Sequence, residues 1–400
     1  MTQASKTARR NLLVTVAMVF AVFTGFAFVL PFLPLFVVRE LGVAEPERAA
    51  LWAGVLIGVA PLLAGLLAPA WGRLADRHGQ KGIAVKALVA YIVLLALSAA
   101  VTSVWQLLAV RIGIGLFGGI GPLGLAMATS QARREDTGRA VGLVQAAQIL
   151  SAAIGPLAGG ILADLIGIRH TFLVTAALCA LALVLLLVFY EERGPAERRQ
   201  AAASPGFRTV VALPGVLALL AVLFTVNFIG RSFTPILPLH LAALGLPDAR
   251  LASATGVLIS CYSLAAAASA WGLGRLSREH SPNKLLLGTL VGGAFIVAPM
   301  ALVPSFELVL ALAVLLGLVA GGSLTLCYTI GGLMVPQDVR TTAFGFFSGA
   351  ALFGGALAPS VAGLVAHLAL RGIYFVDAAL YLALAAALAR GVLLRSRVSP

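Results

Sequence analysis

Apolar residues occur in this chain as long runs that are separated by short polar stretches. A membrane-spanning helix needs about 20 mainly apolar residues, and these runs meet that length repeatedly. They do not alternate apolar and polar positions, so they indicate helices rather than the strands of a membrane barrel. We predict twelve transmembrane helices, at 11–38, 49–72, 83–102, 105–130, 139–165, 170–190, 213–243, 251–275, 284–304, 306–334, 341–366 and 371–394.

Composition supports a membrane protein. Hydrophobic residues make up 60% of the chain and charged residues 11%, whereas a soluble domain has about 45–50% and about 25%. The net charge is +13, and most Lys and Arg fall in loops on one side of the predicted helices. This is the positive-inside pattern, which places both termini in the cytoplasm and argues against a nucleic-acid partner. Three cysteines in three different spans indicate neither a disulfide framework nor a metal site.

The predicted helices divide into two groups of six. The longest polar connection, 191–212, predicts a cytoplasmic linker between an N-terminal bundle at 1–190 and a C-terminal bundle at 213–400. Three segments recur about 200 residues later: PFLPLFV as PILPLHL, APAWG as ASAWG, and AIGPLAGG as ALAPSVAG. The pattern predicts an all-α polytopic membrane protein with two pseudo-symmetric six-helix bundles, an architecture of transporters with a substrate site near the midplane.

A charged turn, GRLADRHGQK, follows the second predicted helix. Asp76 lies there at the C-terminal end of a helix, where the helix dipole disfavours a carboxylate, so it should gain a partner outside its own helix. The turn resembles the G-x-x-x-D-R-x-G-R-R loop of the major facilitator superfamily. The resemblance implies that Gly72 and Asp76 dock against the start of the eleventh helix, near Thr341, with Arg77 in a charge relay, and so hold the cytoplasmic side closed.

Two further stretches resemble the same superfamily. Arg111, within LLAVRIGIGLFGG, is a charge at membrane depth and therefore normally has a function; it resembles an arginine that the family links to proton coupling. SAAIGPLAGG carries Gly155, Pro156 and Gly159, which predict a bend and close helix contacts. This stretch is similar to a motif of the drug:proton antiporter group, and the resemblance implies a role in switching between conformations.

Candidate sites for substrate and protons follow from polar and aromatic residues inside the spans. We expect the first, fourth, seventh and tenth helices to line a cavity. The candidate lining residues are Phe23, Thr24, Phe28, Gln145, Asn227, Phe228, Arg231, Tyr262 and Tyr328. The first helix has no acidic residue, so protons would be handled by Asp377, by Glu40, by a histidine such as His240, or not at all. Arg231 lines the path, binds an anionic group or extends outward to the interface; Asp377 titrates during transport or pairs near the surface.

The whole chain looks like a twelve-helix multidrug efflux transporter. We therefore expect a monomeric secondary transporter in the bacterial cytoplasmic (inner) membrane that exports lipophilic or amphipathic molecules, with small-molecule substrate, protons and lipid as partners. No cofactor is expected, and no phosphate-binding loop or hydrolase motif indicates an ATP-driven pump or an enzyme. The alternatives are a sugar or metabolite facilitator of the same superfamily and, from another class, a membrane sensor.

Overall fold

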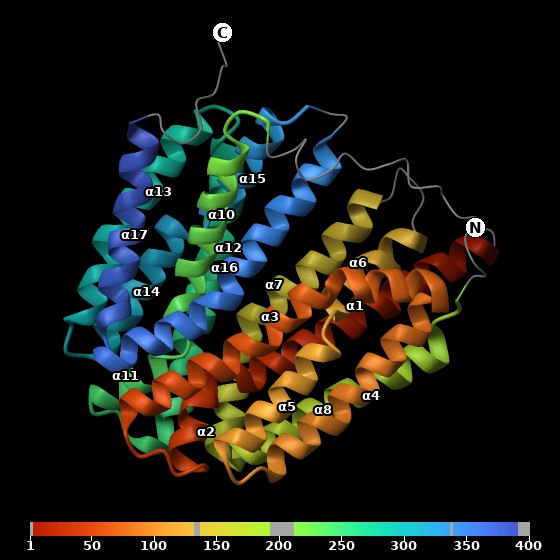
Figure 1. The fold of residues 1–400 in the computed structure, drawn as a ribbon, viewed down its shortest axis with the longest axis horizontal. Coiled ribbons are helices and arrows are strands. Elements are labelled where there is room, and N and C mark those ends of the chain that lie inside the picture. The colour runs from red at the N-terminus through yellow and green to blue at the C-terminus, as the bar shows by residue number, and fades with distance from the viewer. Residues whose placement is uncertain (1–2, 132–136, 193–211, 337–338, 391–400) are drawn as a thin grey trace. The chain divides into compact units, whose positions relative to one another are not determined.

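The computed structural model of the protein describes residues 3–131, 137–192, 212–336 and 339–390, and their regular structure is helical (Figure 1). Within these described ranges, eleven helices are long and apolar enough to cross a membrane, and a bent pair, Val216–Ser232 with Leu237–Ala243, brings the number to twelve. The predicted all-α polytopic fold is therefore confirmed. Nearly all of the predicted linker at 191–212 lies outside the described residues.

The chain forms two compact units, and each of them combines segments from both halves of the sequence. Unit 1 comprises Met1–Glu45, Leu56–Arg199 and Pro247–Ser260, and unit 2 comprises Pro46–Val55, Gln200–Leu246 and Cys261–Pro400. Two long helices, α3 (Pro46–His78) and α12 (Leu251–Leu276), begin in one unit and continue in the other. The division at 1–190 and 213–400 follows the sequence repeats rather than these contacts and stays a prediction.

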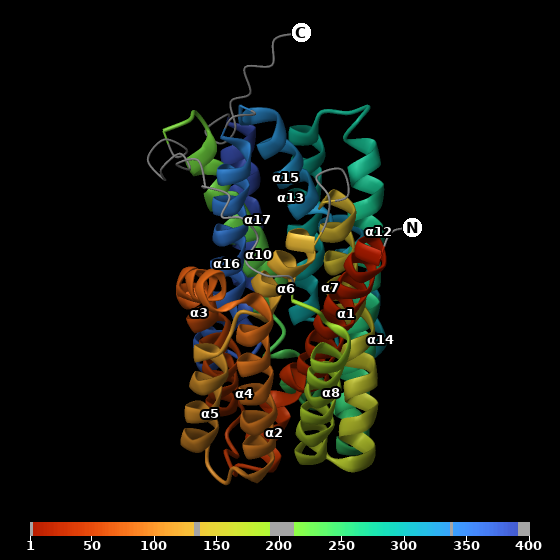
Figure 2. The same cartoon turned by 90° about the vertical axis from the view of Figure 1, so that its right-hand side faces the viewer.

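Unit 1 is built around α1, which packs along α7 and α8, while α4 also runs beside α8 (Figure 2). Besides the first part of α12 and most of α3, the elements of unit 1 are α1 (Gln3–Val29), η1 (Leu30–Phe32), α2 (Leu33–Arg39), α4 (Gln80–Ala100), α5 (Val104–Leu116), α6 (Ile120–Gln131), α7 (Thr137–Ile166), α8 (Ile168–Phe189) and η3 (Asp248–Arg250). Gly79 and Gly167 connect consecutive helices with φ of 87° and 85°, a conformation that glycine adopts at no steric cost. Ser103 starts α5 by accepting a hydrogen bond from the Gln106 amide.

Unit 2 contains the broken span and the helices that pack on it. Its elements are α10 (Val216–Ser232), α11 (Leu237–Ala243), α13 (Pro282–Val297), η4 (Ala298–Ala301), α14 (Phe306–Ala320), α15 (Ser323–Met334), α16 (Arg340–Leu368) and α17 (Gly372–Ala389). Helix α10 packs along α16, and α13 along α17. The α10–α11 pair bends by 41°, because Pro235 has no amide hydrogen to donate to the Arg231 carbonyl one turn earlier.

The two units contain the same close helix crossing. In unit 1, a Cβ atom added at Gly256 of α12 would overlap the carbonyl of Pro156 in α7; in unit 2, one added at Gly54 of α3 would overlap the carbonyl of Pro359 in α16. Glycine and a proline-bent helix therefore bring two backbones into direct contact in each case. These crossings explain why the first turns of α12 and α3 belong to a different unit from the rest of their helices.

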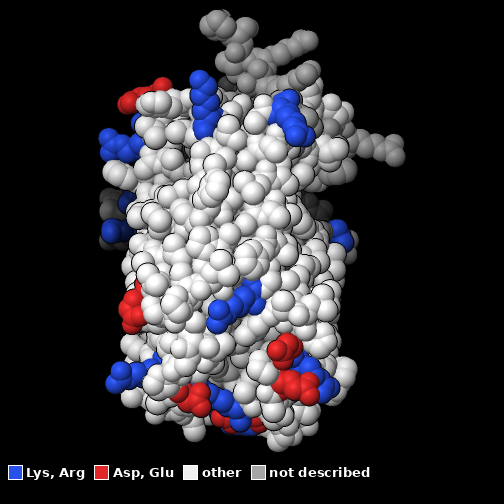
Figure 3. Space-filling model, turned by 90° about the vertical axis from the view of Figure 1, so that its left-hand side faces the viewer, with Lys and Arg blue, Asp and Glu red and all other residues white. Residues whose placement is uncertain are grey.

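The surface is consistent with a lipid environment. Large apolar side chains are widely exposed, for example Leu165 (75%) and Leu368 (85%). Figure 3 shows one face on which uncharged residues cover most of the area. In a water-soluble protein such an area would be an exposed apolar patch, whereas in a bilayer it meets hydrocarbon.

Candidate functional site

Arg111 is held inside unit 1 by a neighbouring backbone. The side chain extends from α5, is only 3% exposed, and donates a hydrogen bond from Nε to the carbonyl oxygen of Leu56 in α3 at 2.8 Å. The ring of Tyr91 on α4 lies within electrostatic reach of the guanidinium. A buried cation is costly unless polar groups solvate it. The geometry thus places a permanent positive charge at the point where α3, α4 and α5 meet.

Asp377 is the buried acid of unit 2. Its carboxyl group lies on α17, is fully inaccessible, and accepts a hydrogen bond at Oδ2 from the Ser232 hydroxyl of α10 at 2.5 Å. The other oxygen, Oδ1, has no hydrogen-bond partner among the described residues. The Ser232 hydroxyl cannot neutralise a carboxylate, so the Asp377 carboxyl group is suited to accept a proton or another small cation.

His240 lies one segment further along the same broken span. The imidazole on α11 is fully buried, and its Nδ1 atom is 3.0 Å from the Tyr374 hydroxyl of α17. Its second nitrogen, Nε2, has no partner in the described part of the chain. Tyr374 and Asp377 are three residues apart on one helix and so share a face. The sequence analysis missed Ser232 and Tyr374, although the spacing of three residues between Tyr374 and Asp377 was a usable signal for the tyrosine.

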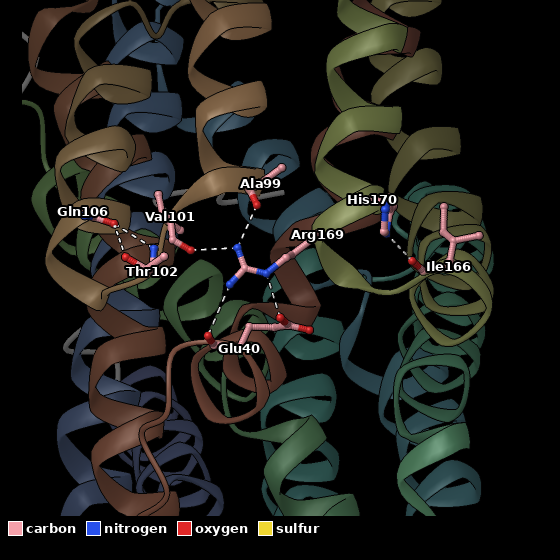
Figure 4. Close-up of polar contacts among 8 residues, drawn as sticks. All are labelled: Glu40, Ala99, Val101, Thr102, Gln106, Ile166, Arg169 and His170. Atoms are coloured by element: carbon pink, nitrogen blue, oxygen red, sulfur yellow. Dashed lines mark hydrogen bonds and ion pairs between the residues drawn. The ribbon is translucent and has the colours of Figure 1, made fainter.

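Glu40 is engaged in an ion pair at the end of α2 (Figure 4). Arg169 of α8 donates from Nε to Glu40 Oε2 at 2.8 Å, and from Nη1 to the carbonyl oxygens of Ala99 and Val101 at 2.8 and 2.9 Å. The guanidinium also lies over the Phe36 ring, 5.4 Å from its centroid. Arg169 thereby ties α2, α4 and α8 together, and Glu40 neutralises it.

The substrate candidates in unit 2 lie on α10, α12 and α15. Arg231 is exposed although it sits in the last turn of α10, and Asn227, one turn earlier, donates to the Ala351 carbonyl of α16. Phe228 is buried and stacks on Phe224, with ring centroids 6.4 Å apart. Two tyrosines complete the set: Tyr262 meets Phe233 edge to face at 5.4 Å, and Tyr328 stacks on Phe344 at 5.9 Å.

The substrate candidates in unit 1 lie on α1 and α7. Thr24 is buried and donates to the Ser151 hydroxyl at 2.9 Å, and Phe28 is buried with its backbone against Gly159. Phe23 is half-buried beside Gly121 of α6, while Gln145 of α7 is exposed. Thr24 and Phe28 therefore contribute to the α1–α7 contact, and Phe23 and Gln145 are more accessible.

The conformational candidates on α7 sit at crowded crossings. A Cβ atom added at Gly155 would overlap Ala27 of α1, and one added at Gly159 would overlap the Phe28 backbone. On the opposite side, Pro156 meets α12, where the Ser260 hydroxyl accepts a hydrogen bond from the Leu157 amide at 3.1 Å. Helix α7 therefore has no room for a side chain at Gly155 or at Gly159. The surroundings of Gly72 and the side chains of Asp76, Arg77 and Thr341 are not described by the structure, so the predicted cytoplasmic closure stays a prediction.

A further carboxylate, which the sequence analysis did not single out, caps the N-terminus of α12. Asp164 of α7 accepts hydrogen bonds from the amides of Ser253, at 2.7 Å, and Ala252, at 3.3 Å. These amides are among the unpaired donors of the first helical turn, and a carboxylate there also interacts favourably with the helix dipole. The sequence analysis expected such an arrangement for Asp76; the described residues contain it at Asp164.

Comparison with known families decides what kind of protein has this architecture. A model of the Major Facilitator Superfamily matches residues 15–308 and 251–400. The chain belongs to the Major Facilitator Superfamily. Multidrug resistance protein MdtG of Proteus mirabilis is 34% identical over 308 residues, which cover 76% of each chain. The multi-drug resistance efflux pump PmrA homolog of Lactococcus lactis is 34% identical over 299 residues, covering 74% of this chain and 73% of that protein.

Solved structures of Major Facilitator Superfamily transporters share the fold. A bacterial homologue of the human lysosomal transporter Spinster, in an inward-facing and occupied conformation, has a TM-score of 0.77 at 17% identity over 99% of this chain and 98% of that one. The human organic anion transporter MFSD10 has a TM-score of 0.64 at 17% identity over 95% and 99%. The predicted superfamily, fold and class of transporter are confirmed: the chain is a multi-pass membrane transporter of small molecules.

Proposed function

We propose that this transporter exports lipophilic and amphipathic small molecules from a bacterial cell in exchange for protons, by alternating access. Proton exchange is supported mainly by Asp377, a fully buried acid inside a span with one oxygen unpartnered among the described residues. The names of the relatives, multidrug resistance protein and multi-drug resistance efflux pump, support drug efflux. We place the protein in the cytoplasmic membrane, as a monomer with cytoplasmic termini.

Four ionisable groups are candidates for proton coupling: Arg111, Glu40, Asp377 and His240, the last of which is considered together with Asp377 below. Glu40 already has a cation, Arg169, at 2.8 Å and lies at the end of its helix. Arg111 stays charged in the membrane and is better suited to set the local field than to carry a proton. Asp377 combines full burial, a single neutral hydrogen-bond donor and a position inside α17. It is the group we assign as the proton carrier.

Polar and aromatic side chains on α10 and α12 would contact the substrate. Arg231, Asn227 and Tyr262 offer a cation, an amide and a phenol, with Phe233 and Phe228 as apolar neighbours. Sites for bulky ligands are mostly apolar with a few placed polar groups. Such a set suits molecules that combine a flat apolar body with one polar group.

Transport into and out of proteoliposomes tests the proposal. Purified protein is reconstituted, and the accumulation of ethidium and of an uncharged fluorescent dye is measured under an imposed pH gradient, an imposed sodium gradient, and no gradient. We expect accumulation with the pH gradient, and its loss in Asp377→Asn. Asp248→Asn is the matched control, because Asp248 is 89% exposed and pairs only at the surface with Arg39.

The same vesicles separate the alternatives. Sugar equilibration without any gradient, and no movement of either dye, would favour the facilitator and refute export. Accumulation driven by sodium but not by protons would refute proton exchange while leaving export intact. No accumulation of any of the compounds would leave a sensor as the better explanation.

A further inference from the structure

The duplicated sequence places different chemistry at equivalent positions of the two units. PILPLHL repeats PFLPLFV, so His240 stands where unit 1 has Phe36. Likewise YFVDAAL, which begins at Tyr374, repeats FLVTAAL, which begins at Phe172. Tyr374 therefore corresponds to Phe172, and Asp377 to a threonine, Thr175. At these positions unit 1 has no ionisable side chain.

The aromatic pair has a similar ring separation in both units, although the rings of the second pair are more tilted. Phe36 and Phe172 are almost fully buried and meet edge to face, with ring centroids 5.2 Å apart. His240 and Tyr374 occupy the matching place with centroids 5.4 Å apart, and add the hydrogen bond between Nδ1 and the phenol. Two phenyl rings thus satisfy the packing of this fold. Packing alone does not require a buried imidazole, and a buried polar group with an unpartnered atom is costly.

Asp377 and its equivalent in unit 1, Thr175, also differ in chemistry while making equivalent helix contacts. In unit 1, the Thr175 hydroxyl of α8 donates to the Gly25 carbonyl of α1 at 2.9 Å. In unit 2, Asp377 of α17 accepts from Ser232 of α10 instead. Both contacts join the same two helices of their repeat, but only the one in unit 2 contains a group that can gain or lose a proton. The ionisable groups of unit 2 are therefore additions to a framework that forms without them.

Ser232 links Asp377 to the break in the span. It is the last residue of α10, and its Oγ lies 2.5 Å from Asp377 Oδ2 and 2.9 Å from the carbonyl oxygen of Ile229 in its own helix. A hydroxyl group has one hydrogen and can donate it to only one of these acceptors at a time. A charged acceptor is favoured over a neutral one, so the choice depends on the protonation of Asp377.

Other charged and titratable groups around the pair are few among the described residues. Asp377 is within electrostatic range of Tyr262 from α12 and of Tyr374 and Tyr381 from its own helix. His240 is within range of Arg371, which donates to the Ala301 carbonyl of η4 at 3.1 Å. Arg231 of α10 is within electrostatic range of the same Tyr262. Phenols are neutral near pH 7, so Arg371 and Arg231 are the fixed charges that bear on this site.

We propose that Asp377 and His240 form one proton-binding site across the break between α10 and α11, with Ser232 and Tyr374 as the positioning residues that transmit its protonation state to the two helix segments. The inference rests on the proposed function, because it supplies the place where the exchanged proton resides. Helix α17 carries one member of each contact, Asp377 toward α10 and Tyr374 toward α11, and so holds both sides of the break.

The proton step is simple to balance. A proton arriving at Asp377 Oδ2 converts the carboxylate to a carboxylic acid and raises the charge of the site by one. The new O–H donates to Ser232 Oγ, and the serine hydrogen turns to the Ile229 carbonyl, back into α10. A proton arriving at His240 makes both ring nitrogens donors, so the Tyr374 oxygen accepts from Nδ1. Each event exchanges a contact with α17 for a different one without breaking a covalent bond.

Infrared difference spectroscopy of the purified protein in lipid, titrated by pH without substrate, tests the site directly. We expect the C=O stretch of a buried carboxylic acid to appear on acidification and to be lost in Asp377→Asn. In Ser232→Ala the band should shift in frequency, and Ser232→Thr should restore it. Thr225→Val is the matched control, because Thr225 bonds only to its own helix at the Ala221 carbonyl; its band should equal that of the wild type.

The histidine is tested by replacing it with the side chains of unit 1. His240→Phe combined with Tyr374→Phe reproduces the Phe36–Phe172 pair and should therefore fold. We expect the midpoint of the carboxylic acid titration to shift in this variant. His170→Gln is the control, because His170 is exposed on α8 and its imidazole hydrogen-bonds to the Ile166 carbonyl within unit 1 (Figure 4), whereas Asp377 belongs to unit 2. An unchanged midpoint in the double variant would remove His240 from the site.

Other outcomes separate this inference from the proposed function. A band that persists in Asp377→Asn, or that is identical in Ser232→Ala and the wild type, would overturn the inference even where vesicles show proton-driven export. Conversely, a band that behaves as expected in a protein that exports nothing would support the proton site and refute the exporter.

Spin labels across the break test its mechanical consequence. Leu217 of α10 is 64% exposed and Ala242 of α11 is also exposed, so both accept labels. The distance between the labels should change with pH in the wild type and stay fixed in Asp377→Asn. The same pH dependence in both proteins would show that Asp377 does not control the bend.

Discussion

Removal of the Asp164 carboxylate should destabilise unit 1 by a measurable amount. The carboxylate accepts two amide hydrogen bonds from the first turn of α12, at 2.7 and 3.3 Å, and is half-buried. Loss of an N-terminal cap costs about 0.5–2 kcal/mol, and loss of the charge near the helix dipole about 0.3–1 kcal/mol. We expect Asp164→Ala to lower the free energy of unfolding by about 1–2 kcal/mol. Asp164→Asn, which keeps one acceptor, should lower it by less.

The native cysteines provide an assay that is specific for each unit. Cys179 of unit 1 and Cys327 of unit 2 are buried and free, so each reacts with a thiol-sensitive dye only on unfolding. With Cys261 and Cys327 replaced by alanine, the dye reports unit 1 alone. For a unit of about 200 residues, 1 kcal/mol corresponds to about 2–4 °C, so Asp164→Ala should lower the unfolding temperature by about 2–8 °C.

An exposed acid close to the same helix start serves as the control. Asp248 lies just before α12 and is 89% exposed, so Asp248→Ala should change stability by at most about 0.5 kcal/mol. Equal unfolding temperatures for Asp164→Ala and Asp248→Ala would refute the reasoning. The reasoning would also be refuted if Asp164→Ala lowered the unfolding temperature reported by Cys327 as much as the one reported by Cys179, because the cap belongs to unit 1.

Three further predictions concern transport. Asp76→Asn should slow export with unchanged membrane insertion, because the sequence motif assigns Asp76 to the cytoplasmic closure; wild-type rates in vesicles would contradict this. Arg111→Ala should abolish active export, because a permanent charge hydrogen-bonded to Leu56 is removed, and full activity would exclude Arg111 from the mechanism. Gly155→Leu should block turnover, because any side chain there overlaps Ala27, whereas Gly142→Leu on the same helix meets no neighbour within 4 Å and should be tolerated. Equal turnover in both glycine variants would reduce Gly155 to an ordinary packing position.

The fold was predictable because hydrophobic runs and repeats depend on local sequence alone. Long apolar runs specify spanning helices, and all twelve predicted spans have a counterpart, including the bent pair of α10 and α11. The prolines in PILPLHL also signalled the break. The sequence did not predict that α3 and α12 begin in one unit and continue in the other. This division depends on where Gly256 and Gly54 meet the carbonyls of Pro156 and Pro359. Contacts between helices so distant in sequence leave no periodic signal.

The candidate site was predictable only in part. Arg111, Arg231 and Asp377 could be found because any charge inside an apolar run is conspicuous. Ser232 was missed because a serine in a helix is common and usually bonds to its own backbone. Asp164 was missed because it lies near the end of a span, where an acid is unremarkable, and its partners are amides that every helix start possesses. Partners supplied by the backbone cannot be identified from residue types.

Differences between the repeats carry more functional information than their similarities. Arg169 and Arg371 occupy matching helix starts, and both donate to carbonyl oxygens of a neighbouring element, at Ala99 and Ala301. Arg169 is neutralised by Glu40, but the segment FVVRELG that carries Glu40 recurs in unit 2 as HLAALG, without an acid. Among the described residues no ion pair neutralises Arg371, so its positive charge bears directly on His240. Because the shared framework already folds around two phenylalanines in unit 1, the imidazole, the carboxyl group and the unneutralised arginine of unit 2 are best explained by charge movement during transport.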